Sequence, residues 1–165
     1  MADVPKVARD RDDQGRARSA RPRDELGRPL PRGAREQLRA ADEEAALPPD
    51  EALAEAQRLI DDGRPFYAHE VLEAVWHVAP EDERGLWQGL AQVAVGLTHV
   101  QRGNAVGAVT LLRRGADKVG RHNADEHGVD IAGVVAAAIG LAAQIEASGL
   151  DQVKPSELVI PLRSG

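Results

Sequence analysis

The stretch Phe66-Tyr67-Ala68-His69-Glu70-Val71-Leu72-Glu73-Ala74-Val75-Trp76-His77 combines a helical apolar pattern with a concentration of polar and aromatic side chains. It holds three of the four Phe, Tyr and Trp residues of the chain. At about 100° per residue, the apolar side chains fall on one stripe of a helix, and the stripe consists of Ala68, Leu72, Val75, Trp76 and Ala79. We therefore expect a helix that ends before Pro80 and buries this stripe, with Trp76 as a core anchor.

Two polar side chains border this apolar stripe. His69 and Glu73 are four residues apart, so they stack on consecutive turns. Glu70 and His77 point further round the helix, toward solvent unless another element covers that side. His69 and Glu73 are therefore the first candidates for a functional site.

A second polar stripe lies on the next predicted helix, residues 83–102, which carries no charge between Arg84 and Arg102. Gln88, Gln92 and His99 fall within about 40° of one another on this helix. Buried amides and imidazoles need partners, because each costs about 1–3 kcal/mol when unpaired. Since a short connection makes consecutive helices antiparallel, we expect His69 within about 8 Å of His99, close enough to share a metal ion, and Glu73 nearer Gln92.

Apolar periodicity and turn residues predict the other elements. Core helices are expected at residues 50–62, 105–119 and 130–148, with Asp50, Asn104 and Asp130 at their starts. In the second of these, the side chains expected to face inward are Val106, Val109, Leu112 and Val119. Residues 34–46 are expected to form a short, mostly exposed helix, and the apolar residues 158–162 to dock in extended form. The fold class is all-α: a compact helical bundle of about five core helices with an N-terminal extended or disordered arm.

Composition divides the chain into residues 1–32, a basic arm rich in Pro and Arg that is disordered or strap-like, and residues 33–165, a single helical bundle domain. Residues 1–39 carry 11 basic and 7 acidic groups, whereas residues 40–165 carry 10 and 20. The acidic body argues against nucleic acid except through the arm. Without cysteine or an apolar run of signal-peptide length, the chain is expected to be cytoplasmic, with no membrane partner and a protein partner possible.

The order of polar and glycine residues resembles a bacterial and archaeal family, domain-of-unknown-function family 309. The resemblance is carried by Gly63, Phe66, His69-Glu70-x-x-Glu73-x-x-Trp76, Gln88-Gly89-x-x-Gln92, His99 and Arg102-Gly103-Asn104. It is strong over residues 51–120 and implies a compact all-α bundle, but no established activity. The shared polar residues that it implies are His69, Glu70, Glu73, Gln88, Gln92 and His99.

Two classes of function remain open, and the sequence does not decide whether the protein is an enzyme. In the first, a His/Glu/Gln cluster between two core helices forms a small-ligand or metal site. The zinc-protease pattern fails because Glu73 stands where a second histidine is needed, but His69, Glu73 and His99 could bind a divalent metal ion as cofactor. Catalytic candidates are then His69, Glu70 and Glu73, and the ligand-binding candidates are Gln88, Gln92 and Trp76.

In the second class, the protein is a non-catalytic interaction or regulatory module, and the cluster is a hydrogen-bond network that fixes the helix register. The basic arm could then recruit a partner. His122 and His127 lie in a polar connection and are expected to be a solvated pair.

Overall fold

Prolines and glycines set the helix boundaries of the computed structural model, which describes residues 46–123 and 127–164. The α-helices in this part of the chain are α2 (Pro49–Asp61), α3 (Pro65–Val78), α4 (Glu81–Gln101), α5 (Ala105–Val119) and α6 (Ile131–Ser148). Two short 3-10 helices follow, η1 (Leu150–Gln152) and η2 (Pro155–Leu158). The predicted all-α bundle of five core helices is confirmed. The predicted arm and residues 34–45 of the predicted first helix lie outside the described residues.

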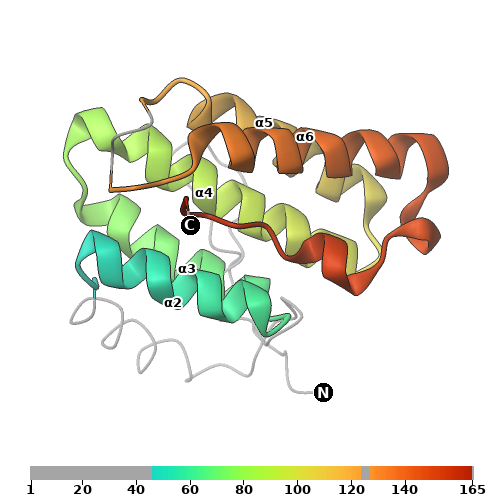
Figure 1. Cartoon of the computed structure of the whole chain (residues 1–165), viewed down its shortest axis with the longest axis horizontal. Helices are drawn as coiled ribbons and strands as arrows, with labels where there is room; N and C mark the ends of the chain where they lie inside the picture. Colours follow the sequence, from blue (N-terminus) through green and yellow to red (C-terminus); the bar gives the residue numbers. More distant parts are fainter. Residues whose placement is uncertain (1–45, 124–126, 165) are drawn as a thin grey trace, which may run out of the picture.

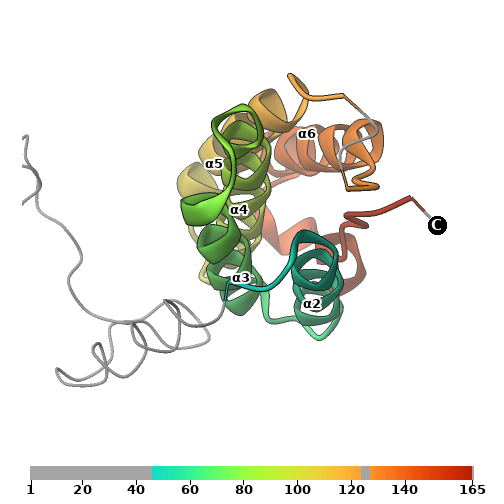
Figure 2. The same ribbon diagram turned by 90° about the vertical axis from the view of Figure 1, so that its left-hand side faces the viewer.

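Helix α4 is the central element of the bundle. It packs against α3 on one side and α5 on the other, while α2 packs on α3 and α6 packs on α5 (Figure 1 and Figure 2). Its core-facing side chains include Leu86, Trp87, Leu90 and Leu97, all with no exposed surface. A helix that is apolar over most of its circumference is buried in this way.

Helices α4 and α5 approach each other closely at glycine residues, which have no side chain. A Cβ atom placed on Gly115 would lie 2.7 Å from the carbonyl oxygen of Gly89 and 2.9 Å from the backbone nitrogen of Val93. At Gly96, such an atom would lie 2.8 Å from Cγ of Leu112. The two helix backbones therefore approach each other at distances that only glycine permits.

The C-terminal segment closes the bundle between α2 and α6 (Figure 1). Ile160 and Leu162 are buried, as expected for the docked apolar end of the chain. The amide group of Gln57 on α2 donates to the carbonyl oxygen of Ile160 (3.3 Å) and accepts from the backbone N–H of Leu162 (2.7 Å). An isolated antiparallel bridge joins Val129, just before α6, to Arg163.

Most predicted helix ends are confirmed. The side chains of Asn104 and Asp130 accept hydrogen bonds from the N–H groups of Gly107 and Gly133, each at 3.0 Å. Asp50, however, does not cap α2, because the helix already begins at Pro49, whose fixed φ suits a first helical position.

Two side chains differ from the predicted core. Val106 is 79% exposed, because it lies about 200° around α5 from the buried Ala108. Trp76 is only partly buried at the edge of the core, with its ring centroid 5.1 Å from that of His77. Trp87 is the tryptophan that is fully buried.

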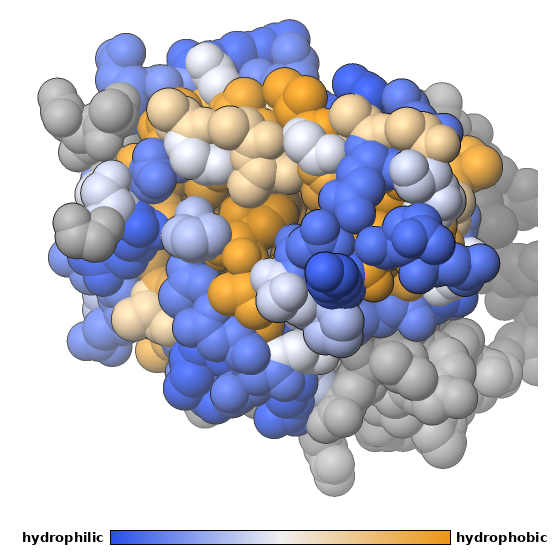
Figure 3. Space-filling model, turned by 45° about the vertical axis from the view of Figure 1, so that its right-hand side comes forward, coloured by the Kyte–Doolittle hydropathy of each residue, from blue (hydrophilic) through white to orange (hydrophobic). Residues whose placement is uncertain are grey.

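Within the described residues, α6 is the helix long and apolar enough to cross a membrane, by length and composition alone. One such helix is weak evidence, since core helices of soluble proteins have the same features. One side of α6 is buried, and its exposed side carries Ala132, Ala136, Ile139 and Ala143. Figure 3 shows apolar surface in the upper part of the molecule, the side on which α6 lies in Figure 1.

The glycine contact predicts opposite effects for two Gly→Ala substitutions. Gly115→Ala should lower the free energy of unfolding by about 1–3 kcal/mol, because the added methyl group meets backbone atoms of α4. Gly140→Ala, in the middle of α6 with nothing within 4 Å, should raise it by about 0.5–1 kcal/mol through helix propensity. Urea denaturation followed by circular dichroism measures both, and equal effects would contradict the close approach.

The two tryptophans should differ in the same way. Trp87→Ala should destabilise the fold by about 3–5 kcal/mol, and Trp76→Ala by clearly less, because only Trp87 is fully buried. Circular dichroism melts compare the two variants without depending on tryptophan emission. An equal loss would show that Trp76 is as important to the core as the sequence pattern indicated.

Candidate functional site

His69 and Glu73 are brought together on α3, as predicted. Nε2 of His69 lies 3.0 Å from Oε2 of Glu73, and Nε2 of His77 lies 3.7 Å from the other carboxylate oxygen. The hydrogen bond from His69, followed by the charges of both histidines, holds the pKa of Glu73 below its usual range, although partial burial acts in the opposite direction. The His69 and Glu73 side chains are 22% and 37% exposed, so the pair lies at the surface boundary rather than in the core.

Two side chains of the predicted polar stripe on α4, Gln88 and His99, contact α5 or the turn before it. Nζ of Lys118 donates to Oε1 of Gln88 at 2.5 Å. Nδ1 of His99 lies 3.2 Å from Nδ2 of Asn104, in the turn that joins α4 to α5. Gln88 therefore contacts α5, and His99 contacts the α4–α5 turn.

The short α3–α4 connection sets which residues of these two helices lie at similar levels. The connection between α3 and α4 consists of Ala79 and Pro80 alone, so the antiparallel register places residue 69 opposite residue 90. His99 lies nine residues further along, about 13 Å along the helix axis. The end of α4 instead reaches the α2–α3 turn, where the Gln101 side chain donates to the carbonyl oxygen of Gly63 at 2.8 Å. No printed contact joins His69 to His99 among the described residues, so their expected approach stays a prediction.

The described residues give no support to the predicted metal site. Across residues 46–123 and 127–164, no group of three or more His, Asp or Glu side chains is arranged to hold a metal ion. His69 and Glu73 are adjacent, and a shared site with His99 stays a prediction.

Two polar atoms of the predicted cluster remain distinctive. Nδ1 of His69 and Oε1 of Gln92 are shielded from solvent and make no hydrogen bond with the described part of the chain. The α3–α4 register places both residues at the same level of these packed helices. They are the part of the predicted ligand site that the geometry still supports.

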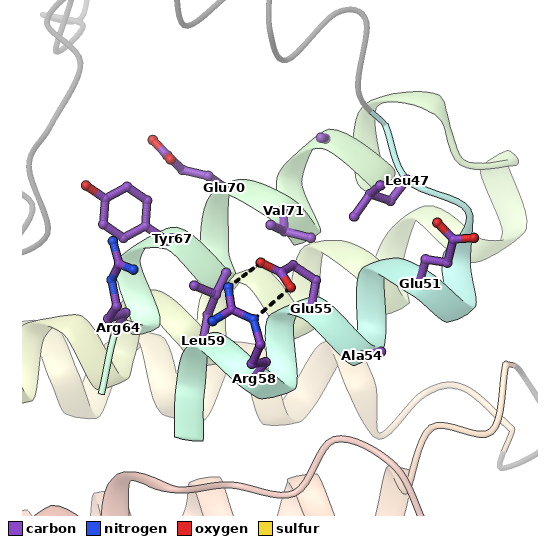
Figure 4. A pocket seen from close by; sticks show the side chains of 11 residues that line it. Leu47, Glu51, Ala54, Glu55, Arg58, Leu59, Arg64, Tyr67, Glu70 and Val71 are labelled. Carbon is purple, nitrogen blue, oxygen red and sulfur yellow. Dashed lines mark hydrogen bonds and ion pairs between the residues drawn. The ribbon is translucent and has the colours of Figure 1, made fainter. Parts of the chain in front are cut away.

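A groove with a volume of about 850 Å³ lies between α2 and α3 (Figure 4). Each helix contributes side chains at helical spacing, so that one face of each lines the groove. The short side chains of Ala54 and Ala74 leave the space open, and Leu59 and Val71 give it an apolar floor. Leu47 lies at one end and Arg64 at the other.

Carboxylates and one aromatic ring surround this apolar floor: Glu51, Glu55, Glu70 and Tyr67. Arg58 donates to Glu55 at 2.6 Å and to Asp62 at 2.9 Å, and its hydrogen bond is the main reason why the pKa of Glu55 is lowered. The guanidinium carbon of Arg64 lies 4.6 Å from the centroid of the Tyr67 ring. Glu70, a predicted catalytic candidate, thus lines the groove.

Sequence reasoning missed the groove and one histidine pair. Helical spacing places residues 51, 55 and 58 on one face of the first helix and residues 67, 70, 71 and 74 on one face of the second. The spacing does not show that these two faces lie opposite each other. Nε2 of His127 lies 3.0 Å from Oε2 of Glu83 and lowers the pKa of that carboxyl group by hydrogen bonding. Both side chains are mostly buried, so the expected solvated state of His127 is wrong.

The central segment of the chain resembles a known family. Residues 53–111 match a domain of unknown function, DUF309. The DUF309 match covers most of α2, all of α3 and α4, and the first half of α5. It confirms the resemblance over this segment, which contains all six shared polar residues. Comparison with curated proteins and with solved structures gives no significant match.

The lowered pKa of Glu73 predicts a pH-dependent contribution to stability. A depressed carboxyl pKa stabilises the fold above the unfolded value of about 4.3, and this contribution is lost as the pH falls through the folded value. Glu73→Gln should therefore lower the free energy of unfolding by about 0.2–1 kcal/mol at pH 6, and the difference should disappear in acid. Urea melts from pH 6 to 3 measure it, with Asp151→Asn as an exposed control. A difference that persists in acid would assign the effect to packing.

Proposed function

We propose that this protein is a binding module that receives an amphipathic helical segment of a protein partner in the α2–α3 groove. The observation that carries the proposal is the apolar floor between two packed helices with three carboxylates at its margin. Helices with an apolar face bind in grooves of this kind, with anchors spaced three or four residues apart.

The dimensions of the groove support a helical segment. Its length follows α2 and α3, and its volume falls in the range of about 300–1,000 Å³ typical of ligand sites. Ala54 and Ala74 face the space with short side chains, so a partner can approach the floor formed by Leu59 and Val71. Side chains such as leucine at helical spacing would bury this floor.

The charges of the groove favour basic residues on the partner. Glu51, Glu55 and Glu70 lie on both helices, and Arg58 is held by Glu55 and Asp62. A cationic group placed beside Glu70 and Glu51 would meet opposite charge on both sides of the groove. The same arrangement disfavours an acidic partner, because like charges would face one another.

The residues shared with DUF309 fit a supporting role in this proposal. Glu73 is bonded to His69, Gln88 to Lys118, and His99 contacts Asn104. These contacts lie within α3, between α4 and α5, and at the α4–α5 turn, where they hold the helices that form and support the groove.

A second function is favoured by Nδ1 of His69 and Oε1 of Gln92, which are shielded without hydrogen-bond partners among the described residues. A small polar ligand between α3 and α4 that donates to Gln92 would satisfy the amide oxygen. Isothermal titration with small amides, compared between the natural chain and Gln92→Leu, tests this site. Equal heats for both proteins would remove it.

The groove is tested by titrating the full chain with a 14-residue Ala/Leu/Arg peptide whose leucines have helical spacing. Backbone amide shifts should change at Ala54, Leu59, Tyr67 and Val71, and a scrambled peptide of equal composition should change them far less. Glu70→Lys should weaken binding about fivefold, equivalent to about 1 kcal/mol, because it reverses a charge at the groove.

The matched control is Asp117→Lys, on the exposed side of α5, which changes the net charge equally. If both charge reversals weaken binding to the same extent, the effect is general electrostatics. Shifts spread over α5 and α6 would likewise overturn the groove as the binding site.

A further inference from the structure

We propose that two copies of this chain associate through the exposed face of α6, with the two α6 helices packed antiparallel about a two-fold axis. This surface is separate from the α2–α3 groove, because Figure 1 and Figure 2 place α5 and α6 on the upper side of the bundle and α2 on the lower side. The inference therefore does not depend on the proposed function. A dimer of this kind would present two grooves on its outer sides.

The composition of α6 indicates that its exposed face is covered in solution. Residues 131–143 are all Ala, Gly, Val, Ile or Leu, and the exposed positions among them are Ala132, Ala136, Ile139, Gly140 and Ala143. The exposed side of the neighbouring α5, in contrast, carries charged side chains. A helix that is apolar all round is a buried helix, whereas the described chain covers α6 on one side.

The size of the exposed side chains favours a second helix over lipid. Four of the five exposed positions are Ala or Gly, which lets the axes of two helices approach to about 8 Å. A helix that lies in a membrane interface inserts large side chains such as Trp, Phe or Leu. Of the five positions, Ile139 is the one with a large side chain, and it is 43% exposed. The face therefore fits another flat helix face of the same kind.

Ion pairs on the α5 side of this face identify the second copy as the occupant. Near the C-terminus of α6, Nη2 of Arg113 donates to Oε2 of Glu146 at 2.9 Å. Toward the N-terminus of α6, Nη2 of Arg121 donates to Oδ2 of Asp117 at 2.8 Å. Arg121 also lines a groove of about 390 Å³ between α5 and α6, together with Ile139. Both ion pairs therefore lie at the margin of the apolar face.

The height of Arg121 along α6 sets the register of the two copies. A Cβ atom placed on Gly120 would lie 3.5 Å from Cγ2 of Val135, so Arg121, one residue later, lies at about the level of residue 134. A two-fold axis midway along α6, between residues 139 and 140, places residue 134 of one copy opposite residue 145 of the other. Arg121 of each copy then lies beside Glu146 of the other copy.

This antiparallel arrangement gives complementary charges at both ends of the interface. The order Arg113, Glu146, Arg121 of the second copy and Asp117 of the second copy alternates in sign, so that each charge has opposite neighbours. A parallel arrangement would place the two Glu146 side chains beside each other. Antiparallel helices also bring the positive N-terminus of each α6 dipole next to the negative C-terminus of the other.

The area of the surface predicts a reversible dimer. Helix α6 has 18 residues, which corresponds to a length of about 27 Å, and α5 lies beside it at an axis distance of about 10 Å. The two helices together present a surface of about 500 Å² per copy, or about 1,000 Å² for the pair, which is the lower limit of specific interfaces. We therefore expect a dissociation constant in the micromolar range.

Sedimentation equilibrium of the full chain from about 1 to 300 μM tests the dimer. The mean mass should rise from the 17.6 kDa of one chain toward twice that value. Ala136→Glu should weaken association at least tenfold, because it places a charge within the apolar face. The matched control is Val78→Glu, at the 67% exposed end of α3, which should leave the dissociation constant unchanged.

Circular dichroism verifies that both variants are folded. A natural chain that stays monomeric over the whole concentration range would overturn the proposal. Equal weakening by Ala136→Glu and Val78→Glu would also overturn it, because the effect would then be a general effect of net charge.

The absence of cysteine from the natural sequence allows a test of the register by disulfide formation. Residue 136 of one copy should lie opposite residue 143 of the other, whereas the two residues 136 should lie about 10 Å apart along the helix axis. An equimolar mixture of Ala136→Cys and Ala143→Cys should therefore form the mixed disulfide at least fivefold more often than either disulfide between identical chains. Mass spectrometry measures the three products. A majority of disulfides between identical chains would overturn the antiparallel arrangement.

A charge exchange between two variants tests the contact of Arg121 with Glu146. Arg121→Glu and Glu146→Arg should each raise the dissociation constant about fivefold when studied alone, because like charges then face each other at both ends. In an equimolar mixture, the mixed dimer has opposite charges at both ends, so association should return to within about twofold of the natural chain. A mixture that associates no better than its separate components would overturn this contact and the register derived from it.

A membrane surface is the competing occupant, and vesicles test it directly. The natural chain should remain in the supernatant when vesicles of phosphatidylcholine and phosphatidylglycerol, mixed at three to one, are sedimented. Co-sedimentation of the natural chain that is lost in Ala136→Glu would overturn the second copy as occupant and assign the face to lipid. Since none of these variants lies at the α2–α3 groove, the peptide titration of the groove can succeed or fail independently.

Discussion

The backbones of α4 and α5 touch at Gly89 and Gly115 without an intervening side chain, and this contact fixes the distance between the two central helices. Because α4 also carries α3, and α5 carries α6, every other helix is positioned from this pair. A larger residue would push backbone against backbone, with no flexible side chain to absorb the change. The rest of the bundle therefore depends on two positions that contribute no side chain at all.

The position of the α2–α3 groove depends on the α4–α5 pair, on which α3 packs, and on the C-terminal segment, which contacts α2. Helix α2 is held on α3 by its own apolar face, which includes Leu53 and Ile60, and on the C-terminal segment by the Gln57 amide, which bonds both before and after Pro161. The Gln57 amide supplies hydrogen bonds that a neighbouring strand would otherwise give to this extended backbone. The side of α2 that bears Ala54 is left facing the groove, so the C-terminal segment helps to define a surface that it does not touch.

Helix number, helix ends and the core face of α6 could be predicted from the sequence, since periodicity, prolines and cap residues act locally. Whether His69 meets His99 could not, because a helical wheel gives the direction of a side chain but not its height along a neighbouring helix. Helix α4 is twenty-one residues long and α3 fourteen, so part of the α4 stripe has no counterpart on α3. The groove was missed for a related reason: Ala54 and Ala74 matter only as a pair across two helices.

On α3 the His69–Glu73 pair lies beside the groove, and Glu70 is the predicted site residue that lines it. Tyr67, Glu70 and Val71 line the groove toward α2, and around the helix Glu70 lies about 100° from His69 and about 60° from Glu73. Helix α3 thus packs against both α2 and α4, which explains why its short sequence is rich in polar and aromatic groups. The Glu73 carboxylate is paired with His69, and Glu70 lines the groove beside this pair.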